Sequence, residues 1–527
     1  MTSSENDLPI DAAYVAPDDL DEFAGEVKVA SSIVDHLSSG LYESPASCLK
    51  ELINNAYDAD ATEVQVFVKP DADRIIVADN GHGFTREQFE DHFDRVSDSA
   101  KRDSGDTTPS LERPLIGHIG IGFIAANEIC EELEIFSTMA GSTDLLHVVI
   151  DFRAMRQPRD TRTSGDDTVK KGDYRGRLEE AGADEHYTQL FLKEIKGEAR
   201  EMLVAPTAAR GIEGDAPSLF GLNADTIAER LKSTRLEAWS DFDFYSQTML
   251  EVGMNVPVRY APGWVPERHH DLVEDFERDV ADLRFKVEYD GTDLRKSIVL
   301  PDAGEGRTLL RRVELQGDHV SATGYFYARY TVLKPLELNG VLLRIRNAAV
   351  GGYDHTFLGF PRTINTLFQR WISCELYVDD RLEPAMNIDR RTLRAAHPAF
   401  AELQTLFHAE LKDFLSLARS ELHSKPTGKK QAVRAREQVE HITSAVQRSA
   451  AGEAPGAGRK EAEDAAKSVE REIEEMLASP ADVRRLLRKW SVAEIYDVVL
   501  EVARETLPPA ERSAFLRALT RKMMRRR

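Results

Sequence analysis

The sequence predicts an α+β protein built from several domains, and three observations lead to this prediction. Strand-like and helix-like segments alternate irregularly over the first ~200 residues, which fits an α+β layer better than a series of βαβ units. A second strand-rich region spans roughly 280–385 and is followed by a long amphipathic helical pattern. From Lys425 onward the chain becomes a low-complexity linker followed by further helical segments.

The N-terminal region is expected to contain two helices and two strands. A helical pattern runs from Phe23 through VKVASSIVDHL, and LYESPASCLKELINNAYDA is typical of a second, longer helix. The runs EVQVFVK at 63–69 and RIIVADN at 74–80 have the composition of strands, and PDAD between them is a turn signal. Residues 1–20 are expected to form a flexible acidic leader.

A loop, a glycine-rich segment and three strands are expected next. The polar stretch 97–116, which contains Gly and Ser, is typical of a loop or lid. The run GHIGIGFIAANEICEE opens with glycines and continues with apolar residues, as a loop entering a helix does. Strands are expected at 132–139 and 145–152, and another at 188–195 after a highly polar stretch.

The second half of the chain is expected to begin with an insertion or linker. Residues 196–225 are rich in Gly, Ala and Pro, and a helix is expected at about 226–239. Later strands are expected at FKVEYDG, RRVELQG, ATGYFYARY, GVLLRIRNAAVG and CELYVDD. The predicted segments are the leader 1–20, a first domain 21–200 with a lid 97–116, an insertion 201–265, a second domain 266–424, a linker 425–466 and a helical region 467–527 with a basic end.

The composition is that of a folded, acidic protein. The 527 residues include 68 Lys+Arg against 91 Asp+Glu, and 42% are hydrophobic, which is enough for a sizeable core. The net charge of −23 argues against nucleic acid wrapped over a large surface, because such binding needs a basic face. The chain shows neither a signal-peptide pattern, nor a long apolar run, nor a CxxC pair among its three cysteines. A cytoplasmic protein without a membrane partner is therefore expected.

The first candidate motif lies on the second predicted helix. Glu51, Asn55 and Asp58 follow one another at spacings of four and three, which places all three on one helix face. Apolar residues surround them, which is unusual for a solvated polar stripe. A simple charge cluster with an asparagine for solubility is the alternative interpretation.

The second and third motifs are glycine-containing loops. Asp79 ends a predicted strand and is followed by Asn-Gly-His-Gly, so that the backbone of Gly81 and Gly83 can pass close to a flat ligand. A plain hairpin turn is the alternative, since Asn-Gly is a strong turn signal. The run Gly117-His-Ile-Gly-Ile-Gly-Phe123 leads into a predicted helix, where free N–H groups can bind phosphate oxygens. Its spacing fits neither GxGxxG nor GxxxxGK[ST], and a loop packed against a neighbour is the alternative.

Together the three motifs resemble the nucleotide site of the GHKL superfamily, which includes gyrase, the ninety-kilodalton heat-shock chaperones, histidine kinases and MutL. ELINNAYDADAT is similar to the first motif of MutL and of the chaperones, and VADNGHGF is similar to the second. GHIGIGF, and flanks such as Val96 to Lys101, are most similar to the chaperones. The resemblance covers the N-terminal ~200 residues. It implies a two-layer Bergerat sandwich, followed here by a β-rich, transducer-like domain and a helical tail.

The resemblance also implies roles for individual residues. Glu51 would be the general base that polarises the attacking water. Asn55 would hold Mg²⁺ through its amide oxygen, and Asp58 would support the lining near the adenine or ribose. Asp79 would accept a hydrogen bond from the adenine amino group. The remaining expected nucleotide contacts are Gly81 and Gly83 beside the base, Gly117, Gly120, Ile121, Gly122 and Phe123 around the triphosphate, and Lys101 in the lid.

A fourth motif, PAMNIDRR at 384–391, resembles the middle-domain loop with which the chaperones bring an arginine to the γ-phosphate. This resemblance assigns Asn387 and Arg390 to that loop, and a guanidinium suits a phosphoryl oxygen by charge and by its forked donors. A solvated helix start is the alternative. Whether Arg390 or Arg391 points inward stays open.

The resemblance as a whole implies a slow, Mg²⁺-dependent ATPase in which ATP closes the lid and docks the second domain, as in the heat-shock chaperones. An ATP-dependent homodimer is expected. After the domain that contains the arginine loop, only about a hundred linker and helix residues remain from Lys425 onward, which puts the chaperones' client binding and constitutive dimerisation in doubt. Two alternatives stay open: a DNA-associated clamp of the MutL or microrchidia type, and a nucleotide-gated module of a multi-protein defence system. Nucleic acid would meet only the basic C-terminus, Arg521 to Arg527.

Overall fold

The chain divides into two compact units, Met1–His423 and Ser424–Arg527. The computed structural model describes parts of the first unit, and the following ranges are covered: 23–30, 44–68, 74–94, 107–117, 122–153, 168–203, 217–233, 236–304, 306–361, 370–387 and 392–422. The predicted leader, linker and C-terminal helical region lie outside these residues.

The first sheet of the described region has nine strands in the order β1-β6-β5-β4-β7-β3-β2-β8-β9. All neighbours in this sheet pair antiparallel except β2 and β8, which are parallel. The strands are β1 (Phe23–Ala30), β2 (Glu63–Phe67), β3 (Arg74–Asp79), β4 (Cys130–Thr138), β5 (Asp144–Asp151), β6 (Thr168–Glu180), β7 (Tyr187–Ile195), β8 (Lys286–Tyr289) and β9 (Thr292–Asp293).

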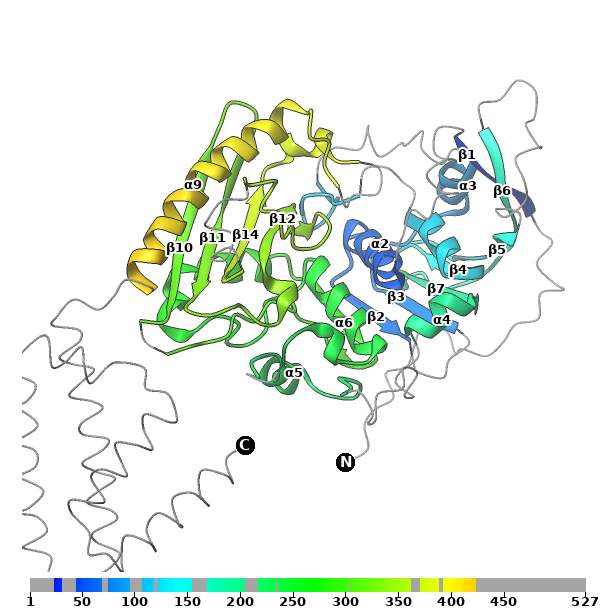
Figure 1. The fold of residues 1–527 in the computed structure, drawn as a ribbon. Coiled ribbons are helices and arrows are strands. Elements are labelled where there is room, and N and C mark those ends of the chain that lie inside the picture. Colours follow the sequence, from blue (N-terminus) through cyan, green and yellow to red (C-terminus); the bar gives the residue numbers. More distant parts are fainter. Residues whose placement is uncertain are drawn as a thin grey trace, which may run out of the picture. The chain divides into compact units, whose positions relative to one another are not determined.

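A layer of helices covers one face of this sheet (Figure 1). The layer contains α2 (Pro45–Asp58), η3 (Gly122–Glu128), α4 (Gly197–Leu203) and α6 (Phe244–Asn255), and α2 contacts each of the other three. Successive residues of β3 point to opposite faces. Ile75 and Val77 therefore join the core under the helices, whereas Ile76 packs with Phe136 and Phe191 on the other face.

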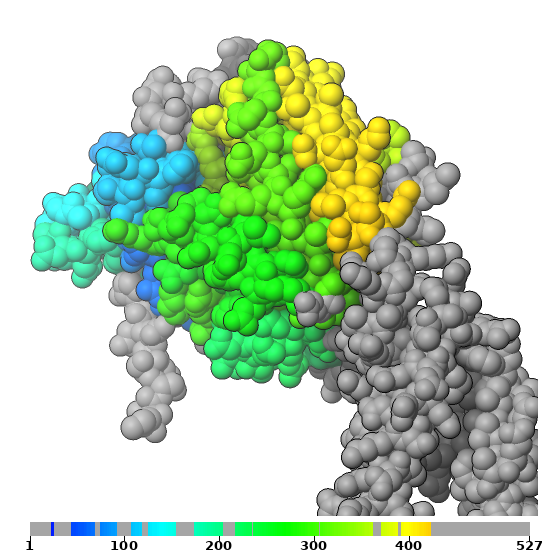
Figure 2. Space-filling view, turned by 90° about the vertical axis from the view of Figure 1, so that its left-hand side faces the viewer, coloured from blue at the N-terminus to red at the C-terminus, as the bar shows by residue number. Residues whose placement is uncertain are grey.

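A five-stranded sheet of the order β10-β11-β14-β12-β13 follows in the same unit. Its strands are β10 (Thr308–Gln316), β11 (Ser321–Arg329), β12 (Gly340–Ile345), β13 (Ala348–Ala349) and β14 (Ile372–Val378). The long helix α9 (Pro398–Leu422) lies across β10 and β11 (Figure 1), and its yellow atoms run beside those of the green second-sheet region in the space-filling view (Figure 2). Phe414 of α9 stacks on Phe326 of β11 with a centroid distance of 4.9 Å.

The remaining described helices are short. They are α3 (Arg86–Asp94), α5 (Ala224–Leu231), η5 (Trp239–Asp241), η6 (Glu267–Leu272), α7 (Glu274–Ala281), η7 (Leu336–Leu338) and η8 (Asp380–Ala385). Among the described helices, none is both long and apolar enough to cross a membrane.

A buried polar network joins the second sheet to α6. Arg344 and Glu375 form a fully buried ion pair, and the hydroxyls of Tyr260 and Tyr325 donate to the same carboxylate at 2.7 and 2.9 Å. Arg344 also donates to the carbonyl of Met254 in α6 at 2.8 Å. Burial of a charge is tolerated when it is paired and hydrogen-bonded in this way. The network therefore holds the second sheet against the helix that packs on α2.

The mixed α+β content predicted from the sequence is confirmed, and β2, β3, β4, β5 and β7 lie within two residues of the predicted strands. The helix expected from Phe23 is wrong, because Phe23–Ala30 is the edge strand β1, which pairs with β6. Strand β6 itself lies in the highly polar stretch before residue 188, for which the sequence predicts no strand. The glycine-rich segment leads into the short 3₁₀-helix η3 and then directly into β4, rather than into a longer helix.

The predicted linker at 196–225 and the helix after it also differ from the structure. Helix α4 begins inside this linker, and the helix expected at about 226–239 is replaced by the shorter α5 and the 3₁₀-helix η5. Helix α4 packs on α2 and α6, and a single-sequence pattern does not contain this tertiary contact.

Candidate nucleotide site

The N-terminus of α2 is fixed by a side-chain cap. Ser44 precedes the helix in an extended conformation, and its hydroxyl accepts the N–H of Ser47 at 3.3 Å. Pro45 follows in the first turn, where a missing N–H carries no penalty. The Ser44 hydroxyl also donates to Glu251 of α6 at 3.0 Å. This cap therefore sets both the start of the helix and its position against α6.

Glu51 lies on α2 with 7% of its surface exposed. Its Oε1 atom is buried and has no hydrogen-bond partner, although the ammonium of Lys50 lies 3.3 Å away. A buried carboxylate oxygen without a hydrogen bond is unfavourable. Glu51 is therefore arranged to accept a hydrogen bond from a water or a ligand, with a neighbouring cation that compensates part of its charge.

Asn55 and Asp58 follow on the same face of α2. Asn55 is half-buried, one turn beyond Glu51. The buried Asp58 carboxylate accepts the N–H of Ile116 through Oδ1 and that of Gly117 through Oδ2, both at 2.7 Å. Both oxygens thus hold the start of the glycine loop. The structure assigns Asp58 a loop-positioning contact, and the expected support of the adenine or ribose stays a prediction.

Asp79 ends β3 and is buried. Its Oδ1 accepts the N–H of Gly81 at 2.8 Å. Burial raises the pKa of Asp79 to about 7, although the Gly81 hydrogen bond and the charge of His186 act in the opposite direction. Near neutral pH the carboxyl group therefore lies at the boundary between its protonated and ionised forms, and a ligand that donates a hydrogen bond favours the ionised form.

The glycines after Asp79 are required by the fold itself. A Cβ atom at Gly81 would lie 2.7 Å from the Ala59 carbonyl oxygen, and Gly83 has φ of +66° with a Cβ position 2.1 Å from the Thr138 carbonyl oxygen. These contacts leave no room for a side chain. The proposed approach to a flat ligand is not needed to explain them and stays a prediction.

The turn after β3 is not a hairpin turn. Strand β3 pairs with β2 and β7, and the chain continues after the turn into α3. The side chain of Asn80 holds the turn, because its Oδ1 accepts the N–H groups of Thr62 and Glu63 at 2.9 Å each. The alternative interpretation of this motif as a hairpin turn is therefore wrong.

The described part of the predicted lid, residues 107–116, is anchored to the C-terminal end of α2. The buried Arg113 guanidinium donates to the carbonyl of Ala61 at 2.9 Å and to that of Tyr57 at 2.5 Å, and it lies 4.2 Å from the Tyr57 ring centroid. Asp60 accepts the N–H of Ser110 at 2.6 Å. Arg113 could not be recognised from the sequence, because a lone arginine in a polar stretch belongs to no motif.

Several predicted contacts fall outside the described residues: Lys101, Gly120, Ile121, Arg390 and Arg391. Gly117 is half-buried, and Gly122 and Phe123 begin η3, which packs on α2. In the arginine loop, Asn387 donates through Nδ2 to the Thr392 hydroxyl at 2.7 Å, and Met386 pairs with Leu393. Asn387 therefore closes the base of this loop.

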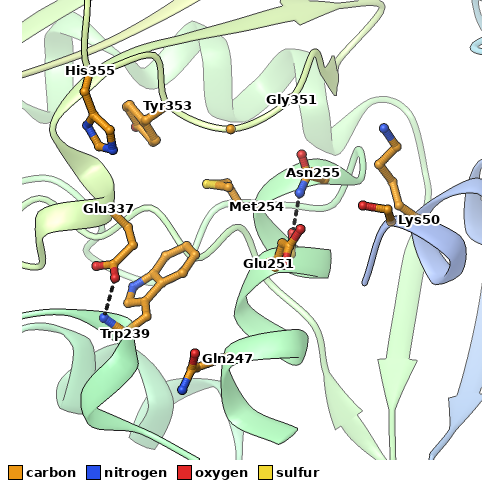
Figure 3. A pocket seen from close by; sticks show the side chains of 12 residues that line it. Lys50, Trp239, Gln247, Glu251, Met254, Asn255, Glu337, Gly351, Tyr353 and His355 are labelled. Carbon is orange, nitrogen blue, oxygen red and sulfur yellow. Dashed lines mark hydrogen bonds between the residues drawn. The ribbon is translucent and has the colours of Figure 1, made fainter. Parts of the chain in front are cut away.

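A cavity of about 310 Å³ lies between α2, α6 and loops of the second sheet (Figure 3). Its lining includes Lys50 of α2, Glu251 of α6, Trp239 and Tyr353. The predicted nucleotide residues Glu51, Asn55, Asp58 and Asp79 do not line it, so this cavity is distinct from the predicted nucleotide site. Among the described residues, no group of three or more His, Cys, Asp or Glu side chains is placed to hold a metal ion.

The region that bears the candidate site matches a known protein family. Residues 42–179, which contain α2, the Asp79 turn and the glycine loop, match the family described as histidine kinase-, DNA gyrase B- and HSP90-like ATPase. The chain therefore carries a GHKL-type ATPase domain of mixed α+β content.

Three curated relatives each match a part of this chain. A putative type II restriction enzyme, HgiDII of Herpetosiphon aurantiacus, is 34% identical over 116 residues, which are 22% of this chain and 18% of that protein. The DNA mismatch repair protein MutL of Trichlorobacter lovleyi is 28% identical over 236 residues, 40% of this chain and 39% of that protein. MutL of Exiguobacterium sibiricum is 40% identical over 81 residues, 15% of this chain and 13% of that protein.

The chain thus matches less than two thirds of each of these relatives. A specific similarity to the heat-shock chaperones is not shown, and the relatives agree better with the MutL-type alternative than with a chaperone.

Proposed function

We propose that this protein is a MutL-type, ATP-gated protein that binds ATP with Mg²⁺, hydrolyses it slowly and uses the resulting closure to act on DNA. The observation that carries this proposal is the arrangement on α2. One helix face presents Glu51 with a buried oxygen that has no hydrogen bond, Asn55, and an Asp58 that holds the first residues of the glycine loop. The mismatch-repair and restriction names of the relatives favour DNA as the partner.

ATP recognition is assigned to Asp79. The ionised Asp79 accepts a hydrogen bond from the adenine amino group through the oxygen that does not hold Gly81. Its buried position makes this contact selective, because a base without a donor at that position would leave a buried carboxylate unsatisfied.

Mg²⁺ fits the donor set near Glu51. Magnesium prefers oxygen ligands and usually keeps several waters, so the amide oxygen of Asn55 would be its ligand from the protein. Bound there, the ion would neutralise the charge of the phosphates. The protein's part is to hold the Asn55 amide one helical turn from Glu51.

Hydrolysis is assigned to Glu51 as general base. Its buried Oε1, which has no hydrogen bond, accepts a proton from the attacking water, and such a base contributes about 10²–10⁴ in rate. The Lys50 ammonium lies 3.3 Å from the same oxygen. The water must displace this contact before it can be activated, and this step would slow turnover.

The DNA part of the proposal is tested by the ATPase rate of the full chain with and without duplex DNA. We expect stimulation that weakens steeply with salt, and that is lost when the five basic residues within 521–527 are replaced by glutamine. Equal stimulation of the glutamine variant by DNA would show that the basic C-terminal residues do not mediate the DNA effect. Suppressed aggregation of an unfolded protein, together with no DNA effect, would favour a chaperone instead.

A further inference from the structure

Arg346 occupies an unusual turn between the two short strands β12 and β13. Ile345 pairs with Ala348, so Arg346 and Asn347 form a two-residue turn, and their φ values are +52° and +68°. Both residues of such a turn need positive φ, which suits glycine and asparagine but is unfavourable for arginine. A strained residue is retained where its side chain is needed.

The Arg346 side chain joins two loops that come from distant parts of the sequence. Its guanidinium donates through Nη1 to the carbonyl of Leu115 at 2.5 Å, and its Nη2 lies 3.3 Å from Glu383 Oε2 and 3.8 Å from Asp380 Oδ2. The side chain is only 10% exposed, so solvent screens these contacts weakly.

The Leu115 end of this contact is the entry to the glycine loop. Arg346 holds the carbonyl of residue 115, while Asp58 holds the next two N–H groups, those of Ile116 and Gly117. The path of the loop is therefore set jointly by the second sheet and by α2.

The other end of the contact is η8, which leads directly into the arginine loop 384–391. Glu383 and Asp380 lie on this short helix, within a few residues of the closed loop base at Asn387. One guanidinium thus contacts the entry of the loop assigned to the phosphates and the entry of the loop assigned to the γ-phosphate arginine.

We propose that Arg346 is a positioning residue that couples the glycine loop to the arginine loop. A triphosphate bound at the glycine loop shifts or stiffens the Leu115 carbonyl, and the guanidinium transmits this change to η8. The guanidinium group of arginine has several N–H donors in a fork and can bind two partners at once. The ammonium group of lysine is a single point charge and is less suited to bridge them. This inference rests on the proposed function, because it requires that a nucleotide binds at the glycine loop.

The kinetic test compares Arg346→Gln, Glu383→Gln and the double variant in the full-length chain. Each single variant should lower kcat for ATP about tenfold while KM stays within about twofold, since the nucleotide contacts themselves remain. The double variant should be no slower than Arg346→Gln, because both changes break the same link. Arg346→Lys should not restore the rate.

Arg381→Gln is the matched control. Arg381 lies on the same short helix but bonds to Asp379, to the carbonyl of Asp318 and to Ser321, away from the glycine loop. It should keep the wild-type kcat. Additive losses in the double variant, or an equal loss in Arg381→Gln, would overturn the coupling.

Hydrogen–deuterium exchange with a non-hydrolysable ATP analogue separates this inference from the proposed function. In the wild type, the analogue should slow exchange both at 115–117 and at 380–387. In Glu383→Gln the analogue should still slow exchange at 115–117 but should no longer slow it at 380–387. Protection of 380–387 that persists in Glu383→Gln and Arg346→Gln would refute the coupling. Absence of protection at 115–117 in the wild type would refute nucleotide binding at the loop itself.

Discussion

Replacement of Asp79 by asparagine should stabilise the fold at neutral pH while it removes nucleotide binding. The substitution preserves the shape of the side chain and the oxygen that accepts the Gly81 N–H at 2.8 Å. It removes the negative charge, which burial makes unfavourable in the folded state, since the pKa of Asp79 is raised to about 7. It also replaces an acceptor with an NH₂ group, which cannot receive the adenine amino donor.

The expected magnitude follows from the difference between the folded and unfolded pKa values. An aspartate in the unfolded chain has a pKa of about 3.9. The neutral carboxyl group stabilises the folded state fully when the pH is below this unfolded-state pKa. The stabilisation is lost as the pH rises toward the folded-state pKa of about 7, and no further loss occurs above that pH. Each pH unit within this window changes the free energy of unfolding by about 1.4 kcal/mol. Between pH 5 and pH 8 the wild type should therefore lose roughly 2–3 kcal/mol relative to Asp79→Asn.

Urea unfolding at pH 5 and pH 8 measures this difference in the free energy of unfolding. The contributions of other titrating groups are the same in the wild type and in Asp79→Asn and therefore cancel. Asp91→Asn, at an exposed position on α3, serves as the control and should follow the wild type. Calorimetric titration with an ATP analogue provides the second readout, with binding lost in Asp79→Asn alone. Parallel pH profiles for the wild type and Asp79→Asn would show that burial does not perturb Asp79, and unchanged ATP affinity would remove it from the nucleotide site.

Three further substitutions test other parts of the account. Glu51→Ala should keep ATP binding and lose turnover by about 10²-fold or more, measured by phosphate release, and unchanged turnover would rule out this base. Arg390→Ala should slow hydrolysis with little loss of ATP affinity, and the same effect from Arg391→Ala instead would mean that the register of the loop is shifted by one residue. Gly83→Ala should destabilise the protein by more than about 2 kcal/mol in urea unfolding, because of positive φ and a backbone clash, whereas Gly141→Ala, with positive φ in open space, should cost about 1 kcal/mol.

The parts of this protein that sequence patterns could predict are those set by local rules. The strand before Asp79 and the α2 face that bears Glu51 and Asn55 follow directly from residue spacing. The local pattern gave a wrong prediction at Phe23. The spacing of apolar residues there is compatible with a helix, but the segment forms a strand because it pairs with β6, about 150 residues later in the chain. Edge strands of this kind are defined by their partner and not by their own composition.

The contacts that organise the site could not be predicted, because their partners are distant in sequence. Asp58 bonds to residues 58 and 59 positions away, and Arg113 also reaches the Leu283 carbonyl, 170 positions away. Arg346 reaches Leu115 over 231 positions. Arg113 and Arg346 look like ordinary charged surface residues in the sequence, and the spacing that places Asp58 in a candidate motif does not reveal its partners. The positive φ of Arg346 is a backbone property that only the structure reveals.

The solution mass of the full chain, measured by light scattering with and without a non-hydrolysable ATP analogue, tests the ATP-gated closure most directly. The account predicts the mass of one 59.1 kDa chain without nucleotide and twice that mass with the analogue and Mg²⁺. Asp79→Asn should stay at the single-chain mass under both conditions. A wild type that binds the analogue and nevertheless remains a monomer would contradict the gating cycle.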